Sequence, residues 1–495
     1  MKAAMNKHTI KVFYDTHSWL GIVAGILLFI VSFSGLPAMF VHELEQWQTP
    51  QLRDLPAVER VDWQQLVDQA GDDMQTQKSL FIVPEAELGY ATLYRRGEDK
   101  ELISKVLSLQ DGSELQPGHS DVAHLFEHLH TDLHLPSPFG RYLVGFAGMV
   151  MLLLIIAGVV IHTKWRQQFT TLRITRSWRL LLTDHHKLLG LWTLPFAALL
   201  AFTGTILGLL GLISPVLALA KFDGNVDAAV EAVVGPDAEI QGVAQQPLPL
   251  NRLYELALAA QPDLQVERAE LTGWGDAGAL VNFSGRARQT LSNLQSVTLN
   301  AVSGEIVHQA DAREHGPFYR IFAAVTPLHY VMFGDELLKL FYALCTLALS
   351  AIVVSGMMIW LDKKQRRDQR PHWLAALTLG SCQGLVLAMA AALAVSSVSH
   401  SMAAQALYEE TVFWLVWGLW IAVCLLLRNL AVRTLLSHGC WLIAAALLLA
   451  VGADSVLHNS WQGSAVVVKG VNLSLLLIAL LSLFVAYRLK KTQNT

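Results

Sequence analysis

The segment "DTHSWLG" at residues 15–21 decides the fold, because it recurs as "DHHKLLG" at residues 184–190. Each copy begins a long apolar stretch, and "FSG" at 33–35 and "FTG" at 202–204 lie further along the two stretches. The matched positions are all 169 residues apart, so the two copies align without a gap. Self-similarity at a fixed offset is typical of a duplicated structural unit. We therefore expect a core of two copies, each made of a helix, an intervening domain and a second helix.

The composition is that of a membrane protein. Of the 495 residues, 53% are hydrophobic and only 15% are charged, which is too apolar for an ordinary soluble protein of this size. A helix needs about 20 apolar residues to cross a hydrocarbon core of roughly 30 Å. Eight segments are long enough: 18–41, 142–162, 188–213, 338–361, 374–395, 411–427, 434–453 and 470–488. The fold class is therefore a mainly α membrane protein with about eight transmembrane helices in a lipid bilayer.

The basic residues near the span ends predict the orientation, because Lys and Arg resist translocation. Lys2, Lys7 and Lys11 precede the first span. Two further clusters lie between the second and third spans (Lys164, Arg166, Arg173, Arg176 and Arg179) and after the fourth (Lys363, Lys364, Arg366, Arg367 and Arg370). We expect both termini in the cytoplasm and a location in the bacterial inner membrane. The first span lacks a small-residue cleavage site, so we expect it to be a retained helix.

Two long segments between spans, 43–140 and 214–337, have the composition of soluble domains. Each contains one stretch with helical periodicity followed by short alternating stretches with Gly-containing turns, which predicts a small α+β domain. The expected order is a first transmembrane helix (1–42), domain 1 (43–140), helices 2 and 3 with a cytoplasmic loop (141–213), domain 2 (214–337), helix 4 (338–373) and a four-helix extension (374–495).

Histidines recur at the ends of the predicted spans. His17 and His186 open the first and third spans, His134 and His329 stand before the second and fourth, and His162 closes the second. From His134 to His162 is 28 residues, roughly 42 Å along a continuous helix at about 1.5 Å per residue. One metal or haem cannot be bound by both, so two stacked sites are indicated, one near each face.

A histidine at a helix end is most often an interfacial polar residue, but the repeat favours a shared role. Neutral imidazole is a good axial ligand for haem iron, and helical bundles build such sites from facing helices. The repeat supports His17 and His186 as ligands. A weaker echo between the second and fourth spans, which matches Leu133-His134 with Leu328-His329 and Gly158 with Gly356, supports His134 and His329. His162 corresponds to Trp360 in the second copy, so the repeat alone does not support it.

The stretch "HLFEHLHTDLHLP" at 124–136 allows a second interpretation. His124 and His128 are spaced four residues apart, as are His130 and His134, and either pair could share a helical face and bind zinc. A zinc hydrolase would need HExxH, which is not present. The sequence also has no GxSxG, Walker or strand–GxGxxG–helix motif, no CxxC, and no basic patch with interleaved aromatic residues. Nucleic acid is therefore not an expected partner.

Several segments together resemble the PepSY-associated transmembrane proteins, and within them the inner-membrane haem proteins regarded as ferric-siderophore reductases. The matching segments, spread over residues 14–364, are "HSWLGIVAG", "ELEQW", "LHTDLHLP" with "GRYLVG", "AGVVIHTKW", "DHHKLLGLWTLPF" and "PLHYVMFG" with "SGMMIW". The resemblance implies a four-helix haem-binding core, a PepSY-like domain in each periplasmic segment, and two b-type haems (haem b) that pass electrons outward.

Carried over residue by residue, the family's histidines fall on His17, His130 or His134, His162, His186 and His329, which restores His162 as a candidate. We expect His134 or His130 to pair with His329 at the outer face, and His186 with His17 or His162 at the inner face.

The function that the resemblance implies is a haem-dependent oxidoreductase that reduces a ferric chelate, in particular a ferrisiderophore, in the periplasm. No flavin or nicotinamide domain is visible, so the electron donor would be a cytoplasmic reductase or a quinol. Two alternatives stay open: a non-enzymatic membrane scaffold or sensor with PepSY-like domains, and a cytochrome b subunit that serves another acceptor. The added spans carry His372, His400, His438 and His458, which have no recognisable partner motif and for which a structural role is the default.

Overall fold

The computed structural model describes residues 6–491 apart from short gaps, and it contains two compact units. The gaps are 72–78, 97–101, 117, 164, 166–168, 171–172, 174–177, 226–227, 229–230, 232–234, 289, 366–371, 400–401, 403 and 463–465. His400 and the basic residues Lys2, Lys164, Arg166, Arg176, Arg366, Arg367 and Arg370 lie outside the described residues. Unit 1 is Met1–Pro50, Gly118–Leu209 and Gly334–Thr495, and unit 2 is Gln51–Pro117 and Leu210–Phe333.

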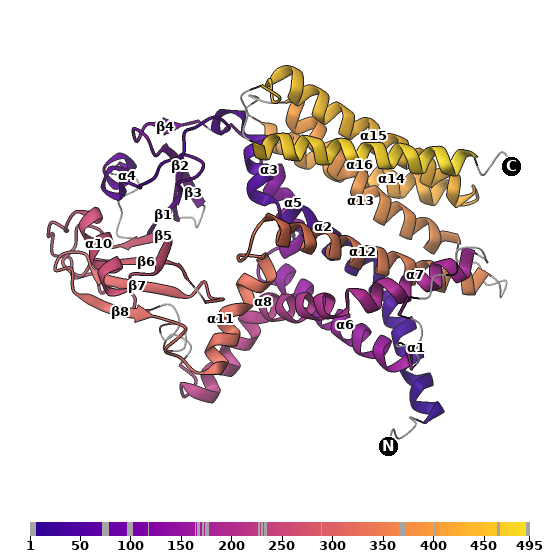
Figure 1. Cartoon of the computed structure of the whole chain (residues 1–495), viewed down its shortest axis with the longest axis horizontal. Helices are drawn as coiled ribbons and strands as arrows, with labels where there is room; N and C mark the ends of the chain where they lie inside the picture. Colours follow the sequence, from indigo (N-terminus) through magenta and orange to yellow (C-terminus); the bar gives the residue numbers. More distant parts are fainter. Residues whose placement is uncertain are drawn as a thin grey trace. The chain divides into compact units, whose positions relative to one another are not determined.

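Unit 1 contains the repeated helices (Figure 1). They are α1 (Lys7–Val23), α2 (Gly25–Ala38), α3 (Val41–Gln48), α5 (Val122–Thr131), α6 (Phe139–Ile161), α7 (Trp178–Trp192), α8 (Leu194–Lys221) and α12 (Glu336–Gln365), of which α8 runs on into unit 2. Helices α1 and α7 are followed by breaks at Ala24 and Thr193, positions that are again 169 residues apart. The duplication seen in the sequence therefore extends to the backbone.

The first predicted span is not one straight helix. Its two parts, α1 and α2, are bent by 67° at the break. Seven helices in the described part of the chain are long and apolar enough to cross a membrane, or eight if this bent pair is one span. The chain is therefore a multi-pass membrane protein. The predicted number of eight spans is reached if α1 and α2 are counted together as one bent span.

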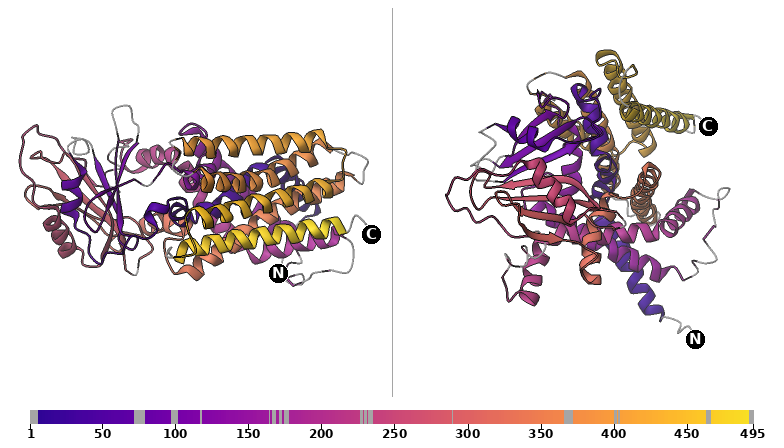
Figure 2. Two further views of the ribbon diagram at one scale, coloured as in Figure 1. Left: turned by 90° about the horizontal axis from the view of Figure 1, so that it is seen from above. Right: turned by 60° about the vertical axis from the view of Figure 1, so that its left-hand side comes forward.

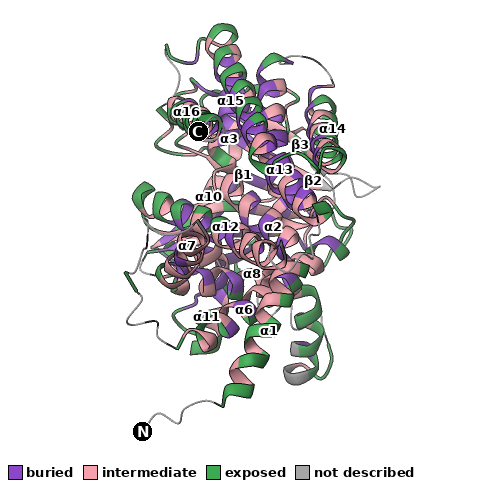
Figure 3. Ribbon diagram, turned by 90° about the vertical axis from the view of Figure 1, so that its right-hand side faces the viewer, coloured by how far each residue is buried: buried purple, intermediate pink, exposed green. Residues whose placement is uncertain are grey.

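Four further helices follow the repeats: α13 (His372–Val398), α14 (Gln405–Leu426), α15 (Val432–Leu457) and α16 (Val466–Lys491), seen side by side in Figure 2. Helix α13 is the most buried of the candidate membrane spans: 78% of the residues in its most apolar stretch are buried. Figure 3 shows this burial in purple. It is rich in Ala, Gly and Ser, and small residues let helices approach closely in a membrane. At Gly384, for example, the indole rings of Trp417 and Trp420 lie against the α13 backbone. These two Trp are therefore packing residues.

Unit 2 contains one eight-stranded antiparallel sheet with the order β4-β3-β2-β1-β5-β6-β7-β8. The strands are β1 (Leu80–Glu85), β2 (Tyr90–Arg96), β3 (Leu102–Ser108), β4 (Glu114–Leu115), β5 (Leu264–Thr272), β6 (Leu280–Ala287), β7 (Gln295–Asn300) and β8 (Ile306–Ala310), and the helices are α4 (Trp63–Ala70), α10 (Leu250–Ala260) and α11 (Pro317–Tyr330). Each half of the sheet is a helix followed by a four-stranded meander.

The two expected soluble domains are joined, which corrects the prediction of two separate ones. Strand β1 of the first segment pairs with β5 of the second, and one apolar core contains Trp63 and Leu66 from α4 together with Leu250 and Phe283 from the second segment. Without this pairing, β1 and β5 would both be edge strands with unpaired backbone groups. Joining them removes both edges and covers one shared core.

Candidate functional site

Three histidines in unit 1 make the same contact with a neighbouring helix. The first is His17 on α1, whose Nδ1 lies 2.9 Å from the backbone oxygen of Leu154 on α6. A carbonyl oxygen only accepts, so Nδ1 carries the hydrogen and donates it, and the lone pair of the neutral ring is on Nε2. One turn further along α6 stands Gly158, where an added Cβ would be 3.4 Å from Cε1 of the imidazole.

The second is His186 on α7, whose Nδ1 donates to the backbone oxygen of Ile352 on α12 at 3.0 Å and also lies 3.0 Å from Ser355 Oγ. Gly356 again stands four residues after the accepting carbonyl, and a Cβ there would be 3.1 Å from Cε1 of His186. The two copies of the repeat therefore build equivalent contacts, α1 on α6 and α7 on α12.

The third is His130 on α5, whose Nδ1 donates to the backbone oxygen of Val31 on α2 at 2.8 Å. A Cβ at Gly35, four residues after Val31, would be 2.9 Å from Cε1 of this ring. His134 differs, because its Nε2 donates to Leu125 O at 2.8 Å. The structure thus distinguishes two histidines that the sequence left as alternatives, and His130 is the one that shares the arrangement.

The glycine in each contact has a geometric cause. Residues i and i+4 lie one above the other on the same face of an α-helix. A ring that reaches the carbonyl of residue i therefore lies against residue i+4, where an added Cβ would crowd the ring at Gly35 and Gly356 and would be in ordinary contact with it at Gly158. The carbonyl can serve both its helical bond and the histidine because it has two lone pairs. The glycines can be located in the sequence, but the backbone carbonyls that accept from the histidines are identified only by the structure.

His17 and His186 face each other, with ring centroids 6.3 Å apart and planes at 80°. Two imidazoles that bind one metal from opposite sides have centroids about 6.3 Å apart, given about 2.0 Å for each metal–nitrogen bond and about 1.15 Å from nitrogen to ring centre. An edge-to-face ring contact has a similar spacing. The more specific observation is that both rings carry the lone pair on Nε2, the nitrogen that a haem iron would need. His17 and His186 are therefore residues that could hold a haem iron.

The first turns of α7 are held by an ion pair beside His186, in which the carboxylate is buried and the guanidinium is partly exposed. Asp184 is 3% exposed and accepts two hydrogen bonds from the guanidinium of Arg173, at 2.6 and 2.8 Å. This bond holds the pKa of the Asp184 carboxyl below its ordinary value. The carboxylate is thus charged and fixed at neutral pH, which orients the first turns of the helix that carries His186.

The structure gives less information on the remaining predicted site residues, His162 and His329. His162 caps the C-terminal end of α6, and its buried Nε2 has no hydrogen-bond partner in the described residues. His329 lies on α11, in unit 2, with its ring 5.7 Å from that of Tyr330. Among the described residues no group of three or more His, Cys, Asp or Glu side chains could hold a metal ion, so the zinc interpretation of residues 124–136 gains no support.

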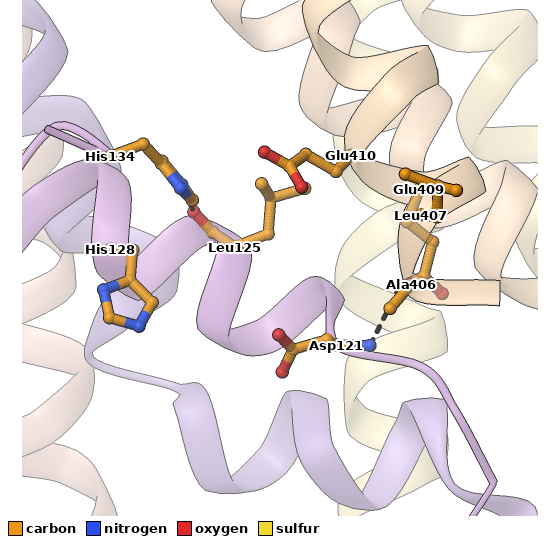
Figure 4. Close-up of a pocket in the computed structure, with 8 residues that line it drawn as sticks. All are labelled: Asp121, Leu125, His128, His134, Ala406, Leu407, Glu409 and Glu410. Atoms are coloured by element: carbon orange, nitrogen blue, oxygen red, sulfur yellow. Dashed lines mark hydrogen bonds between the residues drawn. The ribbon is translucent and has the colours of Figure 1, made fainter. Parts of the chain in front are cut away.

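A cleft of about 320 Å³ lies between α5 and the start of α14 (Figure 4). Its lining is Asp121, Leu125, His128, His134, Ala406, Leu407, Glu409 and Glu410. Next to it, His124 forms a 2.9 Å bond with Asp121 and lies 3.3 Å from Glu45. The bond to Asp121 raises the pKa of His124 to about 9, so this ring is protonated at neutral pH. His124 is therefore part of an ion-pair cluster at the surface.

Sequence reasoning missed Glu409, which is buried in unit 1 at 1% exposure. The available signal was "YEETVF" at 408–413, two acidic residues directly before a predicted span. An ionisable group at that depth is costly unless it has a partner or a role.

Comparison with known proteins agrees with this architecture. The family described as "PepSY-associated TM region" matches residues 14–363. An uncharacterized protein of Pseudomonas aeruginosa is 28% identical over 350 residues, which cover 68% of this chain and 86% of that protein. The matched region contains both copies of the repeat and all three histidine–glycine contacts, and it ends before α13. The chain therefore belongs to the family of PepSY-associated transmembrane regions.

Proposed function

We propose that this protein is an inner-membrane b-type haem oxidoreductase that passes electrons across the membrane and reduces a ferric chelate, a ferrisiderophore in particular, in the periplasm. The observation that carries the proposal is the repeated contact in which a histidine donates from Nδ1 to a helix carbonyl beside a glycine. Such outer bonds fix the orientation and tautomer of a ligating histidine.

We assign His17 and His186 as the ligands of the inner haem, from the geometry of their rings. At the outer site we assign His130, in preference to His134, because it shares the contact with a helix carbonyl, and we pair it with His329 as the family resemblance implies. His162 is the alternative inner ligand that the family resemblance implies. Bound haem would supply one-electron exchange at iron.

The residues of the chain have three tasks in this function. The carbonyls of Leu154, Ile352 and Val31 hold the imidazoles in one tautomer. The glycines let each ring reach its carbonyl. The apolar helices keep water from the ligands, and burial and hydrogen bonding tune the potential of a bound metal centre.

The choice of a ferric chelate as the acceptor rests on the family resemblance. A ferric chelate reduced in the periplasm would release its iron more readily, because the oxygen ligands of siderophores prefer ferric iron. The donor would be a cytoplasmic reductase or a quinol. The rival proposals are a scaffold or sensor without haem, and a cytochrome b subunit that serves another acceptor such as cupric ion.

Spectroscopy of the purified protein tests the proposal. After reduction with dithionite, the spectrum should contain b-type haem bands equivalent to two haems per chain. His186→Ala should lose one of the two haems, whereas His185→Ala should retain both, because the Nδ1 of His185 bonds within its own helix. A wild-type spectrum without haem bands would refute the reductase and favour the scaffold. Stopped-flow reoxidation by ferric chelates and by cupric ion would separate the two acceptors.

A further inference from the structure

Helix α5, which carries His130, has an N-terminus that is not capped by its own residues. Asp121 is the N-cap, but its side chain makes no capping hydrogen bond and instead bonds His124. The first backbone N–H groups of a helix need acceptors from elsewhere. A helix of 10 residues is marginal on its own, because nucleation is costly and few hydrogen bonds repay it. The stability of α5 therefore depends on what its neighbours provide.

Two side chains from other helices provide the missing acceptors. Glu409 on α14 accepts from the Asp121 N–H at 2.9 Å (Figure 4) and from Ser120 Oγ at 2.6 Å. Gln48 on α3 accepts from the Ala123 N–H at 2.9 Å. In a capping box, a Glu at the third helical position bonds the N-cap N–H. Here Glu409 makes that bond from another helix, and both of its carboxyl oxygens accept a hydrogen bond at this end of α5.

A third helix contributes at the same point. Ser120 Oγ also lies 2.9 Å from Ser396 Oγ on α13. Both α13 and α14 belong to the segment that follows residue 363, where the family match ends. The C-terminal extension thus contacts α5, the helix that carries His130, at its N-terminus, where the N-cap side chain makes no capping hydrogen bond.

The connection from cap to histidine is short. His130 is nine residues after Asp121, roughly 13 Å along the helix at about 1.5 Å per residue. At the far end the ring is fixed by the carbonyl of Val31. Helix α5 is therefore held at its first turn by α3 and α14 and at its last turn by α2, and its own N-cap side chain makes no capping hydrogen bond.

We propose that Glu409 is a positioning residue: from α14 it caps α5, and it thereby fixes His130 in the orientation that ligation requires. This gives the C-terminal extension a role, namely to order the helix that carries the outer ligand. The structural half of the proposal stands on the contacts alone, and the half that concerns the haem rests on the proposed function.

Hydrogen exchange on the full-length protein in lipid nanodiscs tests the structural half, with or without haem. Glu409→Ala should accelerate amide exchange in residues 122–131 by about tenfold, the effect of losing a helix cap. Exchange in α6 should be unchanged. Glu410→Ala is the matched control, since Glu410 is exposed and its carboxylate accepts a hydrogen bond from Trp414 of its own helix. Glu409→Gln, which retains one acceptor, should fall between the two and serves if Glu409→Ala does not fold.

The haem half has its own measurement. In Glu409→Ala, one haem should be lost or shift in midpoint potential, while the other keeps the wild-type potential. Unchanged exchange in α5 would overturn the proposal, as would equal acceleration in α5 and α6, which indicates general destabilisation. An equal shift of both haems would do the same. The absence of haem from the wild type would refute the proposed function and leave the exchange result standing.

Discussion

Substitution of the three contact glycines by alanine gives a graded prediction. At Gly356, an added Cβ would be 3.1 Å from His186 Cε1, whereas optimal carbon contacts are about 3.5–4.0 Å. The ring must therefore retreat by about 0.4 Å or more. That movement stretches the 3.0 Å bond to Ile352 O toward the limit of a hydrogen bond, and a net bond of about 1 kcal/mol is weakened.

The other two glycines fix the order of the effects. Gly35 is tighter, with the added Cβ at 2.9 Å from His130 Cε1, and Gly158 is looser, at 3.4 Å from His17 Cε1. Gly190 is the matched control, because it lies on α7 near His186 and a Cβ there meets nothing within 4 Å. Alanine has a higher helix propensity than glycine, by about 1 kcal/mol. Any loss of haem in the other three variants is therefore caused by the ring contact and not by the backbone.

The assay is haem content per chain by the pyridine haemochrome method, with the thermal midpoint measured in parallel. Haem loss should increase in the order Gly190→Ala, Gly158→Ala, Gly356→Ala and Gly35→Ala. In each variant that loses haem, the loss should be restricted to one of the two haems. If Gly190→Ala loses as much haem as Gly356→Ala, or if the order is reversed, the reasoning from ring contacts is wrong.

Further predictions concern single side chains. His17→Ala should remove the same haem as His186→Ala does, while His185→Ala should leave the reduced spectrum unchanged. His124, whose pKa is raised from 6.5 to about 9 by Asp121, stabilises the fold fully below pH 6.5 and loses this contribution as the pH rises through about 9. The difference in thermal midpoint between wild type and His124→Gln should therefore shrink over that interval, and a constant difference would contradict the assignment. Arg313→Lys should lower the denaturant midpoint of unit 2 slightly, because one ammonium cannot replace the forked bonds to two carboxylates; chemical denaturation followed by sheet circular dichroism measures it.

The duplicated core could be predicted from the sequence because a repeat without gaps needs no knowledge of tertiary contacts. The equivalence of His17 and His186 is an example, and the shared helix breaks at Ala24 and Thr193 follow the same offset. The bend of 67° could not be predicted, since an apolar run reports only length and hydrophobicity.

The choice between His130 and His134 is the clearest limit of sequence reasoning at the site. The two are four residues apart, so a helical pattern places them on one face and cannot separate them. The helix in fact ends at Thr131, and the residue that selects His130 is Val31, which is 99 positions away in the chain. Glu409 is a similar case, because its partner Ser120 is 289 positions away.

The joined sheet has a consequence for how the halves of this protein depend on each other. Strands β1 and β5 occupy the same place in their two meanders, and they pair antiparallel, with Leu80 opposite Leu271 and Ile82 opposite Ala269. Antiparallel pairing of equivalent strands is what a twofold axis produces between identical subunits. A chain with a single copy of the repeat would expose β1 as an open edge, and it would complete the sheet by dimerising through that strand. The present chain is in this respect a covalent dimer, so its two halves should reassemble when they are expressed as separate polypeptides.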